Sequence, residues 1–377
     1  MSNELHMEVN PNCTEDLCRL ANNDSSYNNL VHVRADGQDD SIHYLWSSIG
    51  APTFLVVRTE LSSQLQIDWT ALLSNESANS ITFSSPPLFA FAVTFTYLWE
   101  YNDPKDTGNI HTARSNISYY RLESLSWNDF NFNADYNKSM GSFSLLNHLG
   151  ANNGSLQFLL EAYGTDSRSE ALPHLLYTSD SMQCQLKLDS FPTKYRASRF
   201  ALEMLMVKVK EPNEYMTLEE HQSIDDEYTP GIFKAIHYSS GGQNNSGYMS
   251  WKPVCYAGPH HTLEEDRLVQ TYNLQQGVVR IPINSIAHAY FGSDLMLEAT
   301  TLNISFGMQG DGFFHSTKYL DWNAVIGYGL PPRDQLSMLV IAVITTGVGL
   351  PSALFLLGGI YVGCKRVTKK QTYPAID

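Results

Sequence analysis

Hydrophobic and polar residues alternate over several short stretches of the chain, and this period of two is the pattern of a β-strand with one buried face. Asp36-Gly37 stands between two such stretches and is typical of a tight hairpin turn. The alternating stretches are Leu30 to Ala35, Ser41 to Ser47, Leu65 to Trp69, Phe89 to Trp99, Cys184 to Leu188, Phe200 to Met206 and Leu302 to Phe306. Because clusters of Gly, Pro, Asn and Ser separate them, the pattern predicts an all-β region of antiparallel β-sandwich lobes.

A polar stretch from Lys210 to Pro230 interrupts the alternation. We expect it to be the boundary between two β-rich lobes, the first over residues 1–210 and the second over residues 211–333. The sequence shows no internal repeat and no full-length amphipathic helix in this region, so both lobes are expected to consist of sheet.

The stretch from Gln335 to Cys364 contains no charged residue. A helix rises about 1.5 Å per residue, so about 20 apolar residues cross a hydrocarbon core of roughly 30 Å. A buried core helix is the alternative, but such helices are usually apolar on one face, whereas this stretch is apolar all round. The pattern predicts one transmembrane helix over residues 335–364.

Basic residues follow this stretch directly, whereas Arg333 alone precedes it. They are Lys365, Arg366, Lys369 and Lys370. Positive residues favour the cytosolic side, so we expect residues 365–377 to form a cytosolic tail and the preceding chain to lie outside the cytosol. This topology requires an N-terminal signal. Because residues 1–10 have no apolar core, we expect the signal to precede this sequence or the natural start to differ.

The charge of the chain narrows the classes of partner. The net charge is −15, and the basic tail contributes +3, so the region before the apolar stretch carries −18. This charge excludes nucleic acid as a partner and disfavours docking on anionic lipid. All twelve histidines lie in the same region. With reference pKa values, its charge falls to about −2 near pH 5, which suits an acidic compartment.

Cysteines outside the predicted cytosol are even in number, in a setting that permits disulfides. Sequence proximity favours Cys13 with Cys18 and Cys184 with Cys255, while the two other pairings of these four residues remain open. Cys364 stands at the cytosolic edge of the membrane, where it is either palmitoylated or an unmodified thiol.

The sequence contains several acceptor sites for N-glycosylation, which need Asn-x-Ser/Thr with x other than proline. They are Asn12, Asn23, Asn75, Asn116, Asn137, Asn153, Asn244 and Asn303. All lie before the apolar stretch, on the side where glycosylation takes place. The acceptor site at Asn12 differs from the others in having Cys13 at its middle position.

Motifs of catalysis are absent from the sequence: it has no Gly-x-Ser-x-Gly, His-Glu-x-x-His, Cys-x-x-Cys or phosphate-binding glycine loop. The acidic stretch from Glu219 to Glu227 has three interpretations: a site for a hard cation, a pair of acid/base carboxylates, or a solvated acidic loop between lobes. Its spacing fits no EF-hand, so we favour the loop. His260 and His261 are interpreted as a loop pair. We assign no catalytic residue, cofactor or metal ligand.

Small residues recur at intervals of four in the predicted span. They are Gly359 with Gly363, and Gly349 with Ala353. This spacing lets a second helix approach closely, so it predicts a packing seam for a partner helix or for a homo-oligomer. The alternative is that these glycines only reflect the usual composition of membrane helices.

The tail contains Tyr373-Pro374-Ala375-Ile376, which has the form of the Tyr-x-x-apolar sorting signal bound by clathrin adaptors. Pro374 favours the extended conformation that places Tyr373 and Ile376 in separate pockets. An idle tail is the alternative. We expect the motif to direct the protein to the endolysosomal system.

Together these features resemble the glycosylated lysosomal membrane protein family. The stretches that carry the resemblance are the tyrosine tail, "HYLWSSIG" from His43, "EEHQSIDDEYTPGIF" from Glu219, "AYFGS" from Ala289 and "YLDWNAVIGYGLPP" from Tyr319. Asn153 and Asn303 match family glycosylation positions. Asp68 stands where the family has a glycosylated asparagine, and the Cys13/Cys18 pair is not a family feature.

The resemblance implies a single-pass type I protein of the lysosomal membrane, with its N-terminal region in the lumen. It further implies an accessory subunit that protects a lysosomal major-facilitator-superfamily transporter from proteolysis. Such a transporter exports small products of protein digestion, such as dipeptides. Two other classes stay open. A membrane-tethered lumenal hydrolase would need a nucleophile and base that no motif supplies, and a lumenal receptor or adhesion module would bind soluble partners.

Overall fold

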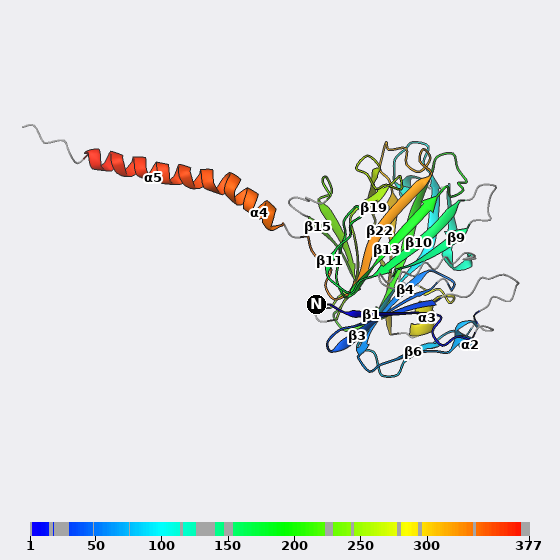
Figure 1. The fold of residues 1–377 in the computed structure, drawn as a ribbon. Helices are drawn as coiled ribbons and strands as arrows, with labels where there is room; N and C mark the ends of the chain where they lie inside the picture. Colours follow the sequence, from blue (N-terminus) through cyan, green and yellow to red (C-terminus); the bar gives the residue numbers. More distant parts are fainter. Residues whose placement is uncertain are drawn as a thin grey trace, which may run out of the picture.

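A body built mostly of strands precedes one long C-terminal helix (Figure 1). The computed structural model describes residues 2–14, 18, 30–47, 49–74, 76–113, 116–125, 140–146, 154–222, 229–242, 245–276, 280–292, 296–334 and 337–370, with only the backbone at 140–146 and 369–370. The body is a sandwich of two antiparallel sheets, which confirms the predicted fold class.

The first sheet has the strand order β1-β2-β3-β4-β7-β14-β21, with β8 beside β7 and with β19 and β20 beside β21. Its strands are β1 (Glu4–Val9), β2 (Leu30–Asp36), β3 (Asp40–Ser47), β4 (Thr53–Glu60), β7 (Phe89–Asn102), β8 (Ile117–Arg121), β14 (Ser198–Val209), β19 (Asp266–Thr271), β20 (Gln275–Gln276) and β21 (Leu297–Phe306).

The second sheet has the order β9-β10-β13-β22-β17-β16-β15, and β18 joins it to β19 of the first sheet. Its strands are β9 (Met140–Leu146), β10 (Ser155–Ala162), β13 (Ser181–Asp189), β15 (Thr217–Gln222), β16 (Lys234–Ser239), β17 (Gly247–Trp251), β18 (Val254–Tyr256) and β22 (Tyr319–Tyr328). β15 is an edge strand and lies near the point where the long helix leaves the body (Figure 1).

The core lies between the two sheets and is rich in aromatic side chains. Phe95 of β7 stacks on Phe158 of β10 with the ring centroids 5.0 Å apart, and Phe306 of β21 meets Trp322 of β22 edge-on at 6.2 Å. All four side chains are fully buried. Each such burial contributes about 1.5–3 kcal/mol, so these contacts hold the two layers together.

A second apolar cluster covers the outer face of the first sheet. In β4, Phe54 faces the core between the sheets, whereas Leu55 faces the second cluster. The covering elements are β5 (Leu65–Ile67), α2 (Trp69–Leu72), β6 (Ile81–Phe83) and α3 (Ile286–Phe291). Asp68 caps the start of α2 by accepting a hydrogen bond from Ala71 N at 3.0 Å.

The expected boundary near residue 210 does not divide the body into two cores. β14 ends at Val209 but pairs along its length with β21, and β13 pairs along its length with β22. The polar stretch expected at the boundary contains the edge strand β15. Edge strands are often polar and charged because one of their sides is open to solvent. The chain on both sides of residue 210 therefore builds one shared core.

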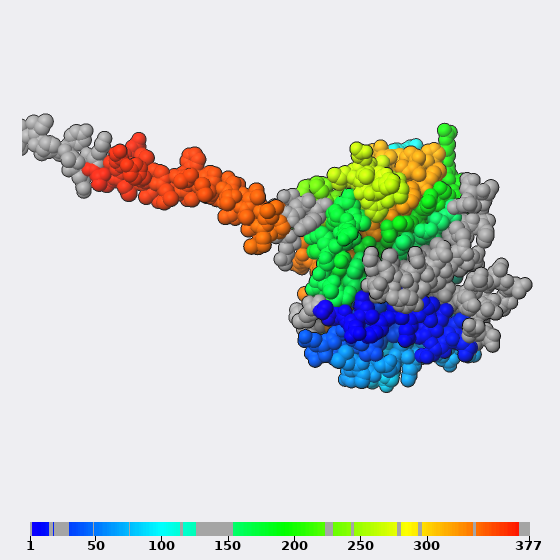
Figure 2. Space-filling model, in the orientation of Figure 1, coloured from blue at the N-terminus to red at the C-terminus, as the bar shows by residue number. Residues whose placement is uncertain are grey.

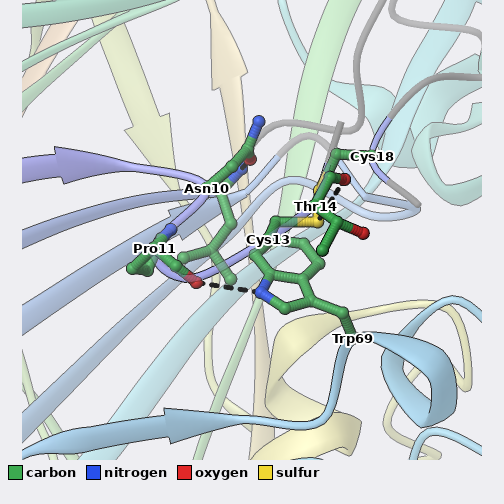
Figure 3. Close-up of a disulfide and its surroundings, with 7 residues drawn as sticks. Asn10, Pro11, Cys13, Thr14, Cys18 and Trp69 are labelled. Carbon is green, nitrogen blue, oxygen red and sulfur yellow. Dashed lines mark hydrogen bonds between the residues drawn. A yellow bond between two sulfur atoms is a disulfide. The ribbon is translucent and has the colours of Figure 1, made fainter. Parts of the chain in front are cut away.

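The N-terminal segment is fixed by a disulfide between Cys13 and Cys18, as expected, with a Cα–Cα distance of 6.3 Å (Figure 3). The Trp69 indole N–H of α2 donates a hydrogen bond to the carbonyl oxygen of Pro11 at 2.9 Å. The disulfide is thereby attached to the elements that cover the first sheet.

The expected Cys184–Cys255 disulfide is wrong, because both residues are buried free thiols. Cys184 of β13 lies opposite Ala324, on one side of β22, and β18 with Cys255 lies on the other side. Two strand spacings separate them by about 9.5 Å, which exceeds the reach of a disulfide of about 7 Å.

The C-terminal helix is long and apolar enough to cross a membrane. The candidate span is Met338–Thr368, 31 residues long; its most apolar window of 18 residues has a mean hydropathy of 2.1, and none of that window is buried by the rest of the chain (Figure 2). It consists of α4 (Met338–Ile344), a π-helical segment η3 (Thr345–Gly349) and α5 (Leu350–Lys370). The wide turn η3 lies just before Pro351, which has no N–H to donate within the helix.

Candidate functional site at the base of the transmembrane helix

Residues 329–334 connect β22 to the apolar helix, and we call them the tether. Its start is held by the backbone: Tyr328 N donates to Asp180 O at 2.9 Å, and Gly329 N donates to Ser246 O at 2.6 Å. Gly329 has a φ of +91°, which glycine adopts without strain. This turn lets the chain leave the end of β22 and run beside β16.

The end of the tether is held by charge. The Asp334 carboxylate lies 2.7 Å from the Arg168 guanidinium of β11 (Ser167–Arg168) and 3.8 Å from the Lys252 ammonium group, just after β17. The Lys252 side chain is only 4% exposed and lies 3.2 Å from the Thr229 hydroxyl. A buried cation is costly unless it is paired. Asp334 therefore compensates a charge that the body buries, and this contact fixes the tether.

An open groove of about 1120 Å³ lies on one side of the tether, and we call it the neck groove. Its acidic residues are Glu211, Glu214 and Glu219. Partial desolvation, followed by the nearby charge of Glu214, raises the pKa of Glu211. Apolar Tyr215 and Leu330 are strongly exposed at its edges. The other lining residues are Pro212, Asn213, Thr217, His221, Ser239, Gly241, Gly242, Asn245, Ser246, Pro331 and Arg333.

A smaller pocket of about 160 Å³ lies between the tether and strands β15 and β16, and we call it the neck pocket. The His237 ring in its wall is 2% exposed and lies 4.6 Å from the His221 ring, centroid to centroid. Burial lowers the pKa of His237 to about 4, and the nearby His221 and Arg333 act in the same direction, although Asp334 opposes this effect. The His237 ring is therefore neutral well above pH 4.

The acidic stretch expected to be a loop is partly a strand. Glu219, Glu220 and His221 lie in β15, whereas residues 223–228 lie outside the described residues. The Glu219 carboxylate lies 3.2 Å from His221, and that of Glu220 lies 2.7 Å from Lys234. In the part of the chain that the structure describes, no group of three His, Cys, Asp or Glu residues has the geometry of a metal site.

The expected glycosylation sites fall into two groups. Asn12 and Asn116 are exposed, and Asn303 is half-buried on β21. The remaining acceptors lie outside the described residues, as does the sorting motif from Tyr373 to Ile376. Glycosylation and sorting therefore stay predictions.

The small residues of the apolar helix lie in different parts of it. Gly359 and Gly363 lie in regular α5, where nothing would contact an added Cβ, whereas Gly349 ends the π-helical segment. All of them, and Ala353, are exposed in this chain. A packing seam at these positions stays a prediction.

The sequence interpretation missed the polar residues that join distant segments. His261, expected only as part of a loop pair, lies 2.9 Å from Leu172 O through Nδ1 and 2.8 Å from the buried Asp321 carboxylate through Nε2. Lys252 was also missed, although a lysine within the apolar run around Trp251 is a signal that it needs a buried partner.

Comparison with known proteins identifies the family to which the chain belongs. The model of the family described as glycosylated lysosomal membrane protein matches residues 29–369. The chain belongs to the glycosylated lysosomal membrane protein family. A relative from Xenopus laevis, glycosylated lysosomal membrane protein A, is 35% identical over 394 residues, covering 100% of this chain and 93% of the relative. The glycosylated lysosomal membrane protein of Homo sapiens is 31% identical, covering 88% of this chain and 83% of the relative.

Family membership makes this a lysosomal membrane protein. One apolar helix follows a large N-terminal body, which is the arrangement of a single-pass type I protein with a lumenal body. The family is named for a membrane glycoprotein and not for an enzyme.

The stretches that carry the family resemblance meet in pairs in the fold. Phe83 lies between His43 at 4.8 Å and Tyr290 at 6.3 Å, and so joins the stretch from His43 to the stretch from Ala289 on the outer face of the first sheet. His221, from the stretch that starts at Glu219, and Pro332, from the stretch that starts at Tyr319, line the same neck pocket. The base of the transmembrane helix is thus built from two of these stretches.

Proposed function

We propose that this protein is a non-enzymatic accessory subunit of a lysosomal major-facilitator-superfamily transporter, which it protects from lumenal proteases. The observation that carries the proposal is the tether. Asp334 is bound to Arg168 and Lys252, so the sandwich is held close to the base of its single span. A body fixed in this way lies over the lumenal loops of a neighbouring membrane protein.

The architecture of the body suits a protective cover. Its strands hold the backbone in antiparallel ladders, which proteases do not cleave without local unfolding. Anchoring by one helix raises the effective concentration of the body at a partner in the same membrane, so a modest lumenal contact suffices. Tyr215 and Leu330 are exposed apolar residues at the neck groove, beside the tether, and such a contact would use them.

The apolar helix supplies a second contact in this proposal. Its side chains are exposed along its length, and an added Cβ at Gly359 or Gly363 would meet nothing within this chain. In an α-helix these two residues lie on one face, four positions apart, and leave a shallow surface for a partner helix.

Co-purification tests the accessory proposal, with variants of three glycines. We expect the wild-type protein to co-purify the transporter from lysosomal membranes, and the Gly359→Leu/Gly363→Leu variant to recover less of it. Gly358→Leu is the matched control, because residue 358 lies about 100° away around the helix. A wild-type protein that recovers no transporter would refute the proposal. Equal recovery of the transporter by all variants would show that this face of the helix is not part of the interface.

Transport to lysosomes is proposed to use the tail. Tyr373 and Ile376 would occupy two pockets of a clathrin adaptor, with Pro374 keeping the segment extended. We expect Tyr373→Ala to raise the amount of protein at the cell surface without affecting its folding, and surface labelling measures this. A variant that reaches lysosomes at the wild-type level would show that the sorting signal is not Tyr373.

A further inference from the structure

The neck pocket contains a polar side chain without a polar partner. His237 is 2% exposed, and among the residues that the structure describes, neither of its ring nitrogens has a hydrogen-bond partner. Leaving a buried polar group unpaired is costly, and most such groups in folded proteins are paired. The ring lines a pocket of about 160 Å³, so a ligand in that pocket is within its reach.

Charged side chains around the pocket are mostly paired in the part of the chain that the structure describes. There, Asp334 has Arg168 and Lys252 as cationic partners, and Glu220 has Lys234. Arg333 lines both the neck pocket and the neck groove, and no ion pair involves it in the described part of the chain. A guanidinium group offers two parallel N–H donors, which match the oxygens of a carboxylate or a phosphate.

We propose that the neck pocket is a binding site for a small oxyanion, a carboxylate or a phosphate, held by the Arg333 guanidinium and the His237 ring. Arg333 supplies the charge and the forked donors, and His237 supplies one N–H at the buried end. Water occupies about 30 Å³ per molecule in the liquid, so the pocket has room for about five waters or one such anion. This site is independent of the proposed accessory function.

The neck pocket lies between the tether and the edge of the sandwich, so a bound ligand would affect how the two are attached. Its ligand would contact the tether through Arg333 and the edge of the sandwich through β15 and β16 at once. An anion bound there would therefore strengthen the attachment of the tether to the body, beside the contact that Asp334 makes.

Titration calorimetry on the full-length protein in detergent tests the site. Sodium phosphate and sodium acetate are the two probes, in a cationic buffer at pH 5.5 and constant ionic strength, and they distinguish phosphate from carboxylate recognition. We expect one of them to bind at a single site. Removing a charge-assisted hydrogen bond should weaken Kd about tenfold in Arg333→Gln. Arg280→Gln, which changes another exposed arginine, should bind as the wild type does.

Arg333 is exposed, so its variant is expected to fold, and thermal unfolding checks this. His237→Phe, which keeps a ring and removes both nitrogens, should also lose binding. No binding of either probe to the wild type, with water as the only occupant, would overturn the inference. Unchanged affinity in Arg333→Gln would overturn it as well, whatever the behaviour of His237→Phe.

Discussion

The Asp334 carboxylate lies 2.7 Å from the Arg168 guanidinium, which joins the end of the tether to a hairpin strand 166 residues earlier in the chain. Both side chains are about four-fifths buried. A partly buried ion pair with this geometry is a charge-assisted hydrogen bond and holds its two segments more firmly than an exposed pair does. It attaches the end of the tether to the folded body.

Removing this pair should loosen the tether. Arg168→Gln is expected to cost about 1.5 kcal/mol of unfolding free energy, which is typical of a hydrogen bond to a charged group. Amide hydrogen exchange over residues 329–334 should become faster, whereas the strands of the core should exchange as before. Exchange over the tether equal to that of the wild type would show that Arg168 does not hold it.

A buried arginine on the first sheet should matter much more than an exposed one. Arg199 is 2% exposed and lies 3.0 Å from Asp103 and 2.7 Å from Asp311, with Asp106 also in contact. Its charge partners would be left unpaired in Arg199→Met, so we expect a loss of about 3–5 kcal/mol in chemical denaturation.

The matched control for Arg199 is Arg121→Met. Arg121 is 55% exposed and pairs with Glu123, so its loss should cost less than about 1 kcal/mol. If Arg199→Met and Arg121→Met lose the same unfolding free energy, burial does not determine what these ion pairs contribute.

Two stacked histidines should make the protein less stable in acid. His32 Nε2 lies 2.9 Å from His43 Nδ1, and burial lowers the pKa of His32 to about 4 and that of His43 to about 3. Both rings are neutral when folded, but unfolded histidine binds a proton below about pH 6.5. Their contribution is thus full above pH 6.5 and is lost as the pH falls from 6.5 towards the folded pKa values.

The size of this effect is measurable. When the pH is lowered from 7 to 5, the protonation of each histidine in the unfolded chain should reduce the free energy of unfolding by about 2 kcal/mol. Denaturation curves of the wild type and of His43→Gln at both pH values test this, because the variant should show a smaller loss on acidification. An identical pH dependence in the two proteins would show that His43 does not remain neutral in the fold.

The strands were predictable wherever one face of the sheet met the core. Leu302, Ile304 and Phe306 alternate in the sequence and are fully buried, because a period of two fixes the face of each side chain. The single shared core was not predictable from the polar composition around Lys210. The second apolar cluster, which contains Leu55, was not predicted either. It is completed by α2 and α3, which come from distant parts of the chain.

The base of the helix was the least predictable part. The contact of Asp334 with Arg168 depends on long-range folding, and neither residue belongs to a motif. Similarly, reference pKa values suggested that most of the twelve histidines are charged near pH 5. Burial lowers the pKa of His32 and His237 to about 4 and that of His43 to about 3, so these three rings are mostly neutral at that pH.

The register of β21 predicts opposite outcomes at neighbouring residues. Ile304 is fully buried, so Ile304→Asp places a carboxylate in the core and should prevent folding or cost more than about 4 kcal/mol. Asn303 is half-buried on the other face, and Asn303→Gln should cost about 1 kcal/mol or less while removing one glycan. Mass spectrometry of the mature protein checks the glycan. An unmodified Asn303 with Ser305 intact would contradict the expected accessibility.

The most direct test of the accessory role is the half-life of the transporter in cells with and without this protein, measured by a chase in the presence and absence of lysosomal protease inhibitors. The account predicts a shorter half-life without the protein, restored by the inhibitors and by re-expression of the wild type, while synthesis stays the same. Replacing the span by a poly-leucine helix should restore it only in part, because the glycine contact is lost. An unchanged transporter half-life in cells that lack the protein would contradict the account.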